Sequence, residues 1–304
     1  MIGMIDLHTH STASDGTFSP ADLAAEAHKA GLSLFALTDH DTVAGIAEAQ
    51  QAGSALGIRV LPGIEISVEW QPGELHLLGL GIDIKNKTLC SLMQYAQEKR
   101  LERNRKIIKK FNEAGIVIDE KKLAQVAGGA VIGRPHFAKY LVQEKKAKSI
   151  QDAFLKYLAK GRPFYIEKEC LPLTEAIEAI KAARGVPVLA HPMSLYLSWG
   201  KLPETIAQFK AQGLVGLEAW HSGARYGECV RLQALAEELN LIVTAGSDFH
   251  GANRKDVYLG RTAANLPIED RFFTDNLLPA LAAVNAEYRG CPKSWLLSEH
   301  PRRV

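Results

Sequence analysis

Histidines and acidic residues recur in short segments along this 304-residue chain, each beside an apolar run. His8, His10 and Asp15 come directly after MIDL (4–7), which is typical of a short buried strand. Imidazole and carboxylate groups continue a buried strand poorly, but they are good metal ligands. The other candidates beside apolar runs are Asp39, His40, Glu65, His76, His191, Glu218, His221, Asp248 and His250. The repetition of the pattern predicts a metal site assembled from distant segments.

The ligand types restrict the metal and the chemistry. There is no cysteine among the candidates, and a mixture of imidazole and carboxylate suits Mn²⁺, Fe²⁺ or catalytic Zn²⁺ better than structural zinc. These candidate ligands are too many for one ion, so we expect at least two ions, with a shared carboxylate such as Glu65 between them. Closely spaced ions activate a bridging water and hold the oxygens of a phosphoryl group, which predicts hydrolysis.

The elements that must position these residues alternate along the chain. Apolar, β-branched runs predict strands at 4–7, 34–37, 59–68, 75–82, 186–190, 214–220 and 241–246. Amphipathic segments between them predict helices: SPADLAAEAHKAG, VAGIAEAQQAGSALG, LTEAIEAIKAARG and YGECVRLQALAEELN, each ending in Gly or Asn. This alternation indicates an α/β fold with a mostly parallel sheet, open or closed into a barrel. In such folds the active site lies at the carboxyl ends of the strands, where most of the candidates fall.

Residues 100–165 break this alternation. LERNRKIIKKFNEAG, PHFAKYLVQEKKAKS and IQDAFLKYLAKG are typical of helices, and no convincing strand separates them. We expect a small helical insertion that covers the substrate side of the α/β core. The predicted organisation is therefore 1–99 for the first part of the barrel, 100–165 for the insertion, and 166–304 for the second part and the tail.

Composition excludes several classes of protein. Hydrophobic residues make up 47% of the chain, which is ample for a core, and the formal net charge of +2 argues against bulk nucleic-acid binding. Cys90, Cys170, Cys229 and Cys291 are scattered, which predicts free thiols in a reducing compartment. With no signal peptide and no long apolar run, we expect a cytoplasmic protein with no membrane association and no obligate protein partner.

The segments DLHTHSTASDG, LTDHDT, GIEIS, HLLGLGI, LAHP and GSDFH resemble, in that order, the PHP superfamily of metal-dependent phosphoesterases. The resemblance covers roughly residues 4–100 and 165–260. It implies a distorted (β/α)₇ barrel related to the amidohydrolases. All nine ligand positions of the family are filled, which argues against a degenerate copy: His8, His10, Asp15, His40, Glu65, His76, His191, Asp248 and His250.

The resemblance also implies how these ligands divide among two or three divalent ions, for which Mn²⁺ is expected and Fe²⁺ or Zn²⁺ are alternatives. One ion would take His8, His10, Glu65 and Asp248. A second would take Glu65, His76 and His191, and a third, if present, Asp15, His40 and His250. Four of the ligands are expected to act directly in catalysis: Asp15, His40, His191 and Asp248.

Other polar residues are candidates for binding the substrate. Arg100, Arg103 and Asn104 would share one face of a helix in the insertion. The loop groups are Arg134 and His136 in IGRPH, and His221 and Arg225 in WHSGARY. Guanidinium groups bind phosphate bidentately, so these clusters suit a substrate with more than one phosphate. The alternative for the helix is an ordinary solvated face.

The insertion and the segment GRPHFA are similar to small bacterial nucleotide phosphatases of the superfamily. That similarity implies removal of the 3′-phosphate from 3′,5′-bisphosphonucleotides such as pAp, by attack of a metal-bridging hydroxide. The 5′-phosphate would then bind to the insertion. Three alternatives stay open: a 5′→3′ exonuclease on short RNA, a histidinol-phosphate phosphatase, and a non-catalytic metal-binding module.

Overall fold

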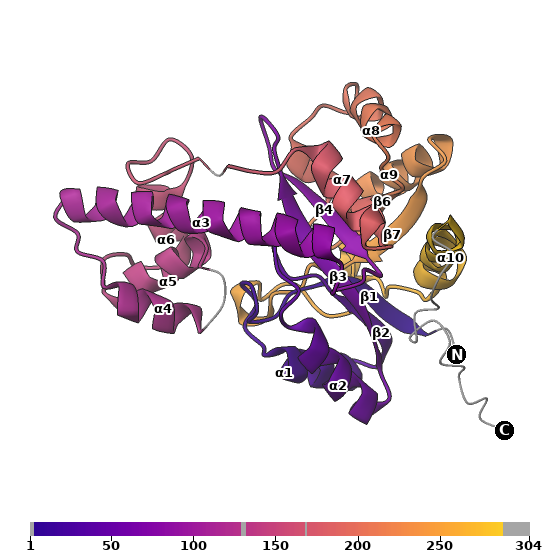
Figure 1. Ribbon diagram of the computed structural model, residues 1–304, viewed down its shortest axis with the longest axis horizontal. Coiled ribbons are helices and arrows are strands. Elements are labelled where there is room, and N and C mark those ends of the chain that lie inside the picture. Colours follow the sequence, from indigo (N-terminus) through magenta and orange to yellow (C-terminus); the bar gives the residue numbers. More distant parts are fainter. Residues whose placement is uncertain (1–2, 129–131, 168, 288–304) are drawn as a thin grey trace.

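A single sheet of seven strands forms the centre of the computed structural model, which describes residues 3–128, 132–167 and 169–287 (Figure 1). In sheet order the strands are β1 Met4–Thr9, β2 Leu32–Leu37, β3 Arg59–Val68, β4 Leu75–Leu80, β5 Val186–Leu189, β6 Gly216–His221 and β7 Ile242–Gly246. Neighbouring strands are parallel except β4, which is antiparallel to both of its neighbours. All seven predicted strands are confirmed, with their ends shifted by at most two residues.

The sheet curls until its first and last strands meet. The His10 N–H donates to the Phe249 carbonyl at 2.9 Å, and the Asp248 N–H donates to the His8 carbonyl at 2.9 Å. Thr9 and Phe249 form an isolated parallel bridge at the same place. The predicted distorted barrel is therefore confirmed, and its seam closes at the carboxyl ends of β1 and β7.

The reversed strand β4 explains how His76 reaches this end of the barrel. β3 and β4 form a hairpin in which Ser67, near the end of β3, pairs with His76 at the start of β4. Because β4 runs the other way, its first residues lie beside the last residues of β3. His76 is thus brought to the rim where the parallel strands end.

Helices cover the outside of the barrel. They are α1 Pro20–Lys29, α2 Ile46–Leu56, α7 Leu173–Ala182, α8 Leu202–Ala211, α9 Tyr226–Glu238 and α10 Leu278–Glu287. Short 3₁₀ helices lie at Pro192–Leu195 (η2), Gly251–Asn253 (η3) and Ala263–Asn265 (η4), and a π-helix at Phe272–Leu277 (η5) precedes α10. The four helices predicted between strands are α1, α2, α7 and α9, and all are present. The Ser19 hydroxyl caps α1 by accepting from the Asp22 N–H at 3.0 Å, as expected for a serine at this position.

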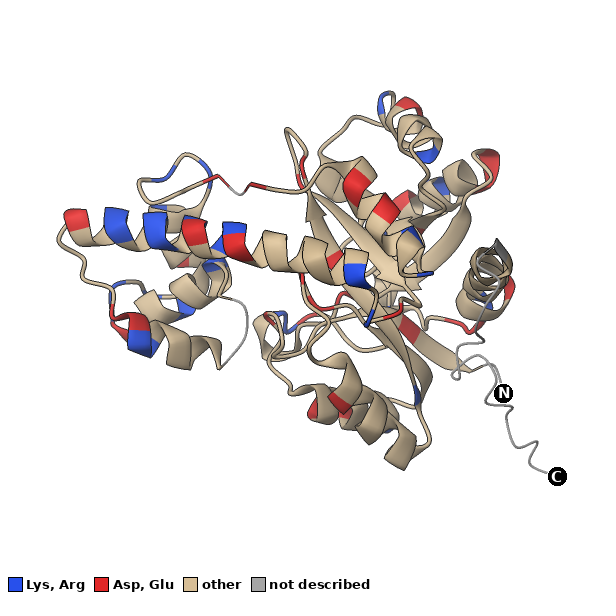
Figure 2. Cartoon of the chain, viewed as in Figure 1, with Lys and Arg blue, Asp and Glu red and all other residues tan. Residues whose placement is uncertain are grey.

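The segment between β4 and α7 contains a second hydrophobic core. Its helices are α3 Lys87–Glu113, α4 Glu120–Ala127, α5 Arg134–Gln143 and α6 Ile150–Ala153, followed by the π-helix η1 Phe154–Leu158. Phe111 and Phe137 are central to this core, whereas Leu89 and Met93, earlier on α3, pack on the barrel. One long helix thus joins the two parts, and its outer half carries many of the Lys and Arg residues (Figure 2). The proposed domain boundaries at 99 and 165 remain predictions.

Two further expectations bear on the fold. Within the described part of the chain, no helix is long and apolar enough to cross a membrane. Cys90 is an exposed free thiol and Cys229 a buried one, Cys170 is half-buried, and Cys291 lies outside the described residues.

Candidate metal centre

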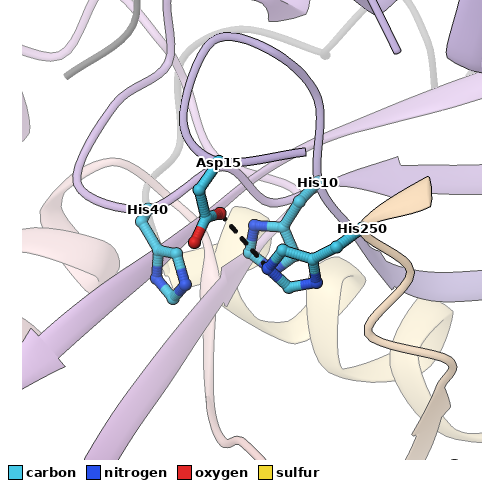
Figure 3. A group of neighbouring side chains, drawn as sticks. All are labelled: His10, Asp15, His40 and His250. Carbon is cyan, nitrogen blue, oxygen red and sulfur yellow. Dashed lines mark ion pairs between the residues drawn. The ribbon is translucent and has the colours of Figure 1, made fainter. Parts of the chain in front are cut away.

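Eight of the nine predicted ligands form three overlapping groups of nitrogen and oxygen atoms at the closing end of the barrel, and the ninth, His191, lies outside these groups with its Nε2 3.0 Å from Glu65 Oε1. In each group the ligand atoms lie within 4.8 Å of one another. The groups are His8, His10, Glu65 and Asp248; His10, Asp15, His40 and His250; and His40, Glu65 and His76. Figure 3 shows the second group, in which the Asp15 carboxylate lies 3.2 Å from His250 Nε2. The geometry thus brings together residues from across the chain that the sequence predicted to meet.

The carboxylate of Glu65 occupies the centre of the site. Its Oε1 lies 2.9 Å from His76 Nδ1 and 3.0 Å from His191 Nε2. Its Oε2 lies 2.9 Å from His40 Nδ1 and 3.2 Å from His10 Nε2. Each oxygen therefore faces a different set of imidazoles, which is the arrangement that a bridging carboxylate needs.

The donor atoms are better placed to bind divalent cations than to form hydrogen bonds with one another. His8 Nε2 and His10 Nε2 are 3.1 Å apart, and each lies 3.2–3.4 Å from Asp248 Oδ1. Despite these short contacts, several buried atoms of the cluster make no hydrogen bond of acceptable geometry, among them His10 Nδ1, Glu65 Oε2 and His76 Nδ1. Buried polar atoms are rarely left unsatisfied in proteins. Converging imidazole and carboxylate donors with no thiolate suit Mn²⁺, Fe²⁺ or catalytic Zn²⁺.

Electrostatics favour cations at the same place. Burial lowers the pKa of His10, but hydrogen bonds to Asp248 and Glu65 and their charges outweigh it and raise that pKa to about 10. For Glu65, burial raises the pKa, and the neighbouring His40, His76 and His8 more than reverse this, so its pKa lies well below its ordinary value. The pKa of Asp248 is lowered well below its ordinary value for the same kind of reason. The carboxylates stay ionised and attract positive charge, from protons or from metal ions.

Local backbone structure fixes the ligands. His191 and Asp248 have positive φ angles of 27° and 56°, which are unusual for residues other than glycine and are typical of functional sites. Asp39 organises the loop between His10 and Asp15, because it accepts from the Ser11 N–H at 2.8 Å and from the Ser14 hydroxyl at 2.6 Å. Asp39 is therefore a support for the site, although its residue type had made it a metal candidate.

A cavity of about 1050 Å³ opens above these ligands and is lined by both the barrel and the insertion. Of the seven predicted substrate-binding residues, His136 and His221 are among the described lining residues. Both have a defined tautomer, because the Nδ1 atoms of His136 and His221 each accept a backbone N–H at 3.0 Å, from Gly133 and Gly223. Their Nε2 atoms therefore carry the proton.

The other five predicted residues lie outside the described lining. The Arg100 guanidinium binds the Asp41 carboxylate, and Arg103 is 95% buried, with its pKa lowered to about 9 by burial and by the nearby arginines. Asn104 donates from Nδ2 to the Ile132 carbonyl at 2.8 Å. Arg134 lies 3.6 Å from the lining residue Glu74. The fifth residue, Arg225, is exposed.

Sequence reasoning missed two cationic residues that line the cavity. Arg254 lines the cavity and its guanidinium contacts the Asp248 carboxylate. Lys139 of α5 also lines the cavity. A lone arginine in HGANRKD and a lysine on a helix carry no distinguishing signal, since their approach to the site depends on the tertiary fold.

The fold and this site define a family of barrel phosphoesterases, and the chain belongs to the PHP domain family, whose model matches residues 6–169. A 5′-3′ exoribonuclease Rnm of Escherichia coli is 36% identical over 81% of this chain and 84% of its own length. A 3′,5′-nucleoside bisphosphate phosphatase of Chromobacterium violaceum is 33% identical over 87% of this chain and 93% of its own. A solved amidohydrolase from Chromobacterium violaceum, with bound sulfate, has a TM-score of 0.80 and 32% identity, covering 93% of this chain and 97% of that one. Metal-dependent phosphoesterase activity follows from this membership together with the ligand set.

Proposed function

We propose that this protein removes the 3′-phosphate from nucleoside 3′,5′-bisphosphates such as pAp. The observation that carries the proposal is one cavity lined by the metal ligands at its base and by His136 and Lys139 of α5 on its insertion side. A substrate with two phosphates would place one over the ligands and the other at the start of α5, where helix N–H groups and Arg134 add positive potential. The similarity to the 3′,5′-nucleoside bisphosphate phosphatase of Chromobacterium violaceum supports this substrate.

Each residue has a role in the proposed reaction. Two or three divalent ions, proposed to be Mn²⁺, would be held by the nine ligands and would supply Lewis-acid activation of water and of the phosphoryl oxygens. Asp15, His40, His191 and Asp248 hold the reacting centre in place. His221 presents its Nε2–H, 3.5 Å from Asp248 Oδ2 and without a hydrogen-bond partner, toward the site. We assign to this N–H a hydrogen bond to the leaving 3′-oxygen, where it stabilises the developing negative charge while water supplies the proton.

A second candidate function is 5′→3′ exonucleolytic cleavage of short RNA. Two relatives of that activity, from Haemophilus influenzae and Escherichia coli, are 37% and 36% identical to this chain. Both substrates present a 5′-phosphate and a phosphoryl group at the adjacent 3′-oxygen, so the same residues would serve both reactions.

Measuring both the phosphate and the mononucleotides that the Mn²⁺-loaded protein releases separates these functions. The substrates are pAp, 5′-AMP, 3′-AMP, histidinol phosphate and a 5′-phosphorylated RNA trimer, assayed in parallel. Preference for pAp with 5′-AMP as product supports the proposal, release of mononucleotides from the trimer at a higher kcat/KM favours the exonuclease, and preference for histidinol phosphate overturns both.

Arg134→Ala tests the binding of the second phosphate. A charge-assisted contact is worth about 1.5–3 kcal/mol, so KM for pAp should rise roughly 10- to 150-fold while turnover of 4-nitrophenyl phosphate is unchanged. Lys122→Ala is the matched control, because Lys122 is an exposed cation of the same insertion that pairs with Glu144. Equal losses on both substrates would place Arg134 at the reacting phosphate instead.

A further inference from the structure

Glu218, on β6, is a completely buried carboxylate beside the metal ligands without belonging to any of the three ligand groups. Its Oε1 lies 3.0 Å from His8 Nδ1, and its Oε2 accepts the backbone N–H of His191 at 2.7 Å. One buried carboxylate therefore contacts two predicted ligands at once.

The two contacts fix the tautomer of one predicted ligand, His8, and the backbone of another, His191. With a Glu218 oxygen as the acceptor 3.0 Å away, His8 carries its proton on Nδ1 and turns the lone pair of Nε2 toward the ligand cluster. The contact with the His191 N–H holds a residue whose φ of 27° is strained. His8 belongs to the group with Asp248, whereas His191 contacts the opposite oxygen of Glu65.

We propose that Glu218 is a positioning residue that couples two metal sites, by fixing the tautomer of His8 and the backbone of His191. This inference rests on the proposed metal site. Carboxylates that hold a ligating histidine typically change metal affinity by 10- to 100-fold when removed. Glu218 should exert this effect at two sites rather than one.

Glutamine at this position gives the sharpest test. An amide has one acceptor and one donor end, so it cannot accept from His8 and from the His191 N–H together. If its oxygen faces His191, its NH₂ donates to His8 Nδ1 and forces the proton onto Nε2, which then cannot bind a metal. If its oxygen faces His8, two N–H donors oppose each other at His191.

Calorimetric titration of Mn²⁺ into the metal-free wild type, Glu218→Ala and Glu218→Gln measures the affinity and number of sites. We expect Glu218→Ala to weaken two sites by about 10- to 100-fold and Glu218→Gln to weaken one of them more than the other. Thr244→Val is the matched control, since Thr244 is the buried neighbour that pairs with Glu218 on β7, and it should bind Mn²⁺ like the wild type.

The outcomes are distinct. A wild type that binds no Mn²⁺ overturns the metal site itself. If the wild type binds and Glu218→Ala binds equally well, only the positioning role is overturned, and a Glu218→Gln protein with both sites at wild-type affinity overturns the coupling. The isosteric Glu218→Gln keeps the test valid should the alanine variant fail to fold.

A second feature of the cavity, Tyr196, stands on separate observations. This side chain lines the cavity and is 75% exposed, and its φ of 52° is unusual for a bulky residue. The preceding turn is held rigidly, because Trp70 Nε1 donates to the Leu195 carbonyl at 3.1 Å and the Glu74 N–H donates to the Ser194 carbonyl at 2.8 Å. The backbone is thus strained at the residue that presents an aromatic ring at the edge of the proposed active site.

We infer that Tyr196 is a stacking platform for the nucleobase, an inference that rests on the proposed nucleotide substrate. Apolar residues of the insertion, Val126, Ile150 and Phe154, line the same cavity and would enclose the base from the other side. Stacking of a base on an aromatic side chain contributes about 1–3 kcal/mol and tolerates all four bases.

Equilibrium binding of 5′-AMP and of ribose 5-phosphate tests this role without turnover. We expect Tyr196→Ala to weaken 5′-AMP about 5- to 150-fold and to leave ribose 5-phosphate unchanged, with Tyr196→Phe as the ring-preserving control. Equal effects on both ligands, no effect, or a wild type that does not prefer 5′-AMP would overturn the platform. Failure of pAp hydrolysis with this binding preference intact would overturn only the proposed reaction.

Discussion

Arg100 gives the most decisive test of how the insertion is joined to the barrel. Its guanidinium binds the Asp41 carboxylate, and the two side chains are only 11% and 1% exposed. Asp41 also accepts the Ser67 N–H on its Oδ1 at 3.1 Å, and its carbonyl accepts from Gln97 Nε2 at 3.1 Å. Since Asp41 directly follows the predicted ligand His40, these contacts bind α3 to the loop that carries this ligand.

The expected cost of breaking this pair follows from its burial. Removing one partner of a buried ion pair typically costs about 3–5 kcal/mol, because the other charge loses its compensation. We therefore expect Arg100→Met to lower the free energy of unfolding by about 3 kcal/mol. In a double-mutant cycle with Asp41→Asn, the double variant should be less destabilised than the sum of the single variants, by roughly 1–3 kcal/mol.

Urea unfolding of the four proteins, followed by circular dichroism, measures these energies. Arg105→Met is the control, because Arg105 is exposed on the same helix and its loss should change stability by less than about 0.5 kcal/mol. The reasoning is refuted if Arg100→Met unfolds like the wild type but has a raised KM for pAp. Arg100 would then be a substrate contact, as its residue type first predicted.

Three further predictions concern the metal centre. Asp15→Ala and His191→Ala should each lower kcat by more than about 100-fold through lost ligation, and near-normal turnover would remove those residues from the ligand set. Because the pKa of His10 is raised to about 10, the metal-free protein holds a proton there at pH 7, and a metal ion must displace it to bind. Mn²⁺ affinity should therefore rise with pH, and calorimetry in two buffers should detect the released proton. No proton release would contradict the raised pKa. Mn²⁺ at about 100 times its Kd should stabilise the fold by about 2.7 kcal/mol per site, seen as a higher Tm that EDTA reverses; an unchanged Tm would argue against binding to the native state.

The clustering of the candidate ligands could be predicted because its signal is local. Each histidine or carboxylate stands beside an apolar run, and the ends of parallel strands meet at one edge of a sheet. His76 is the exception, because it stands at the start of its strand and reaches the same rim only since β4 is antiparallel to its neighbours. The substrate residues were harder to predict, since an arginine on a helix looks the same whether it faces solvent, substrate or a buried carboxylate. The partner of Arg100 lies 59 residues away, and only the tertiary fold brings the two together.

The place where the barrel closes links its stability to its chemistry. β1 and β7 meet through the backbone of residues 8–10 and 248–249, and three of those residues, His8, His10 and Asp248, are predicted ligands of one ion. An ion held there would join the first and last strands across the seam and would compensate for the strained backbone of Asp248. The contacts between β1 and β7 would then both stabilise the closed barrel and position the ligands. A substitution at this seam should therefore affect metal binding and folding together.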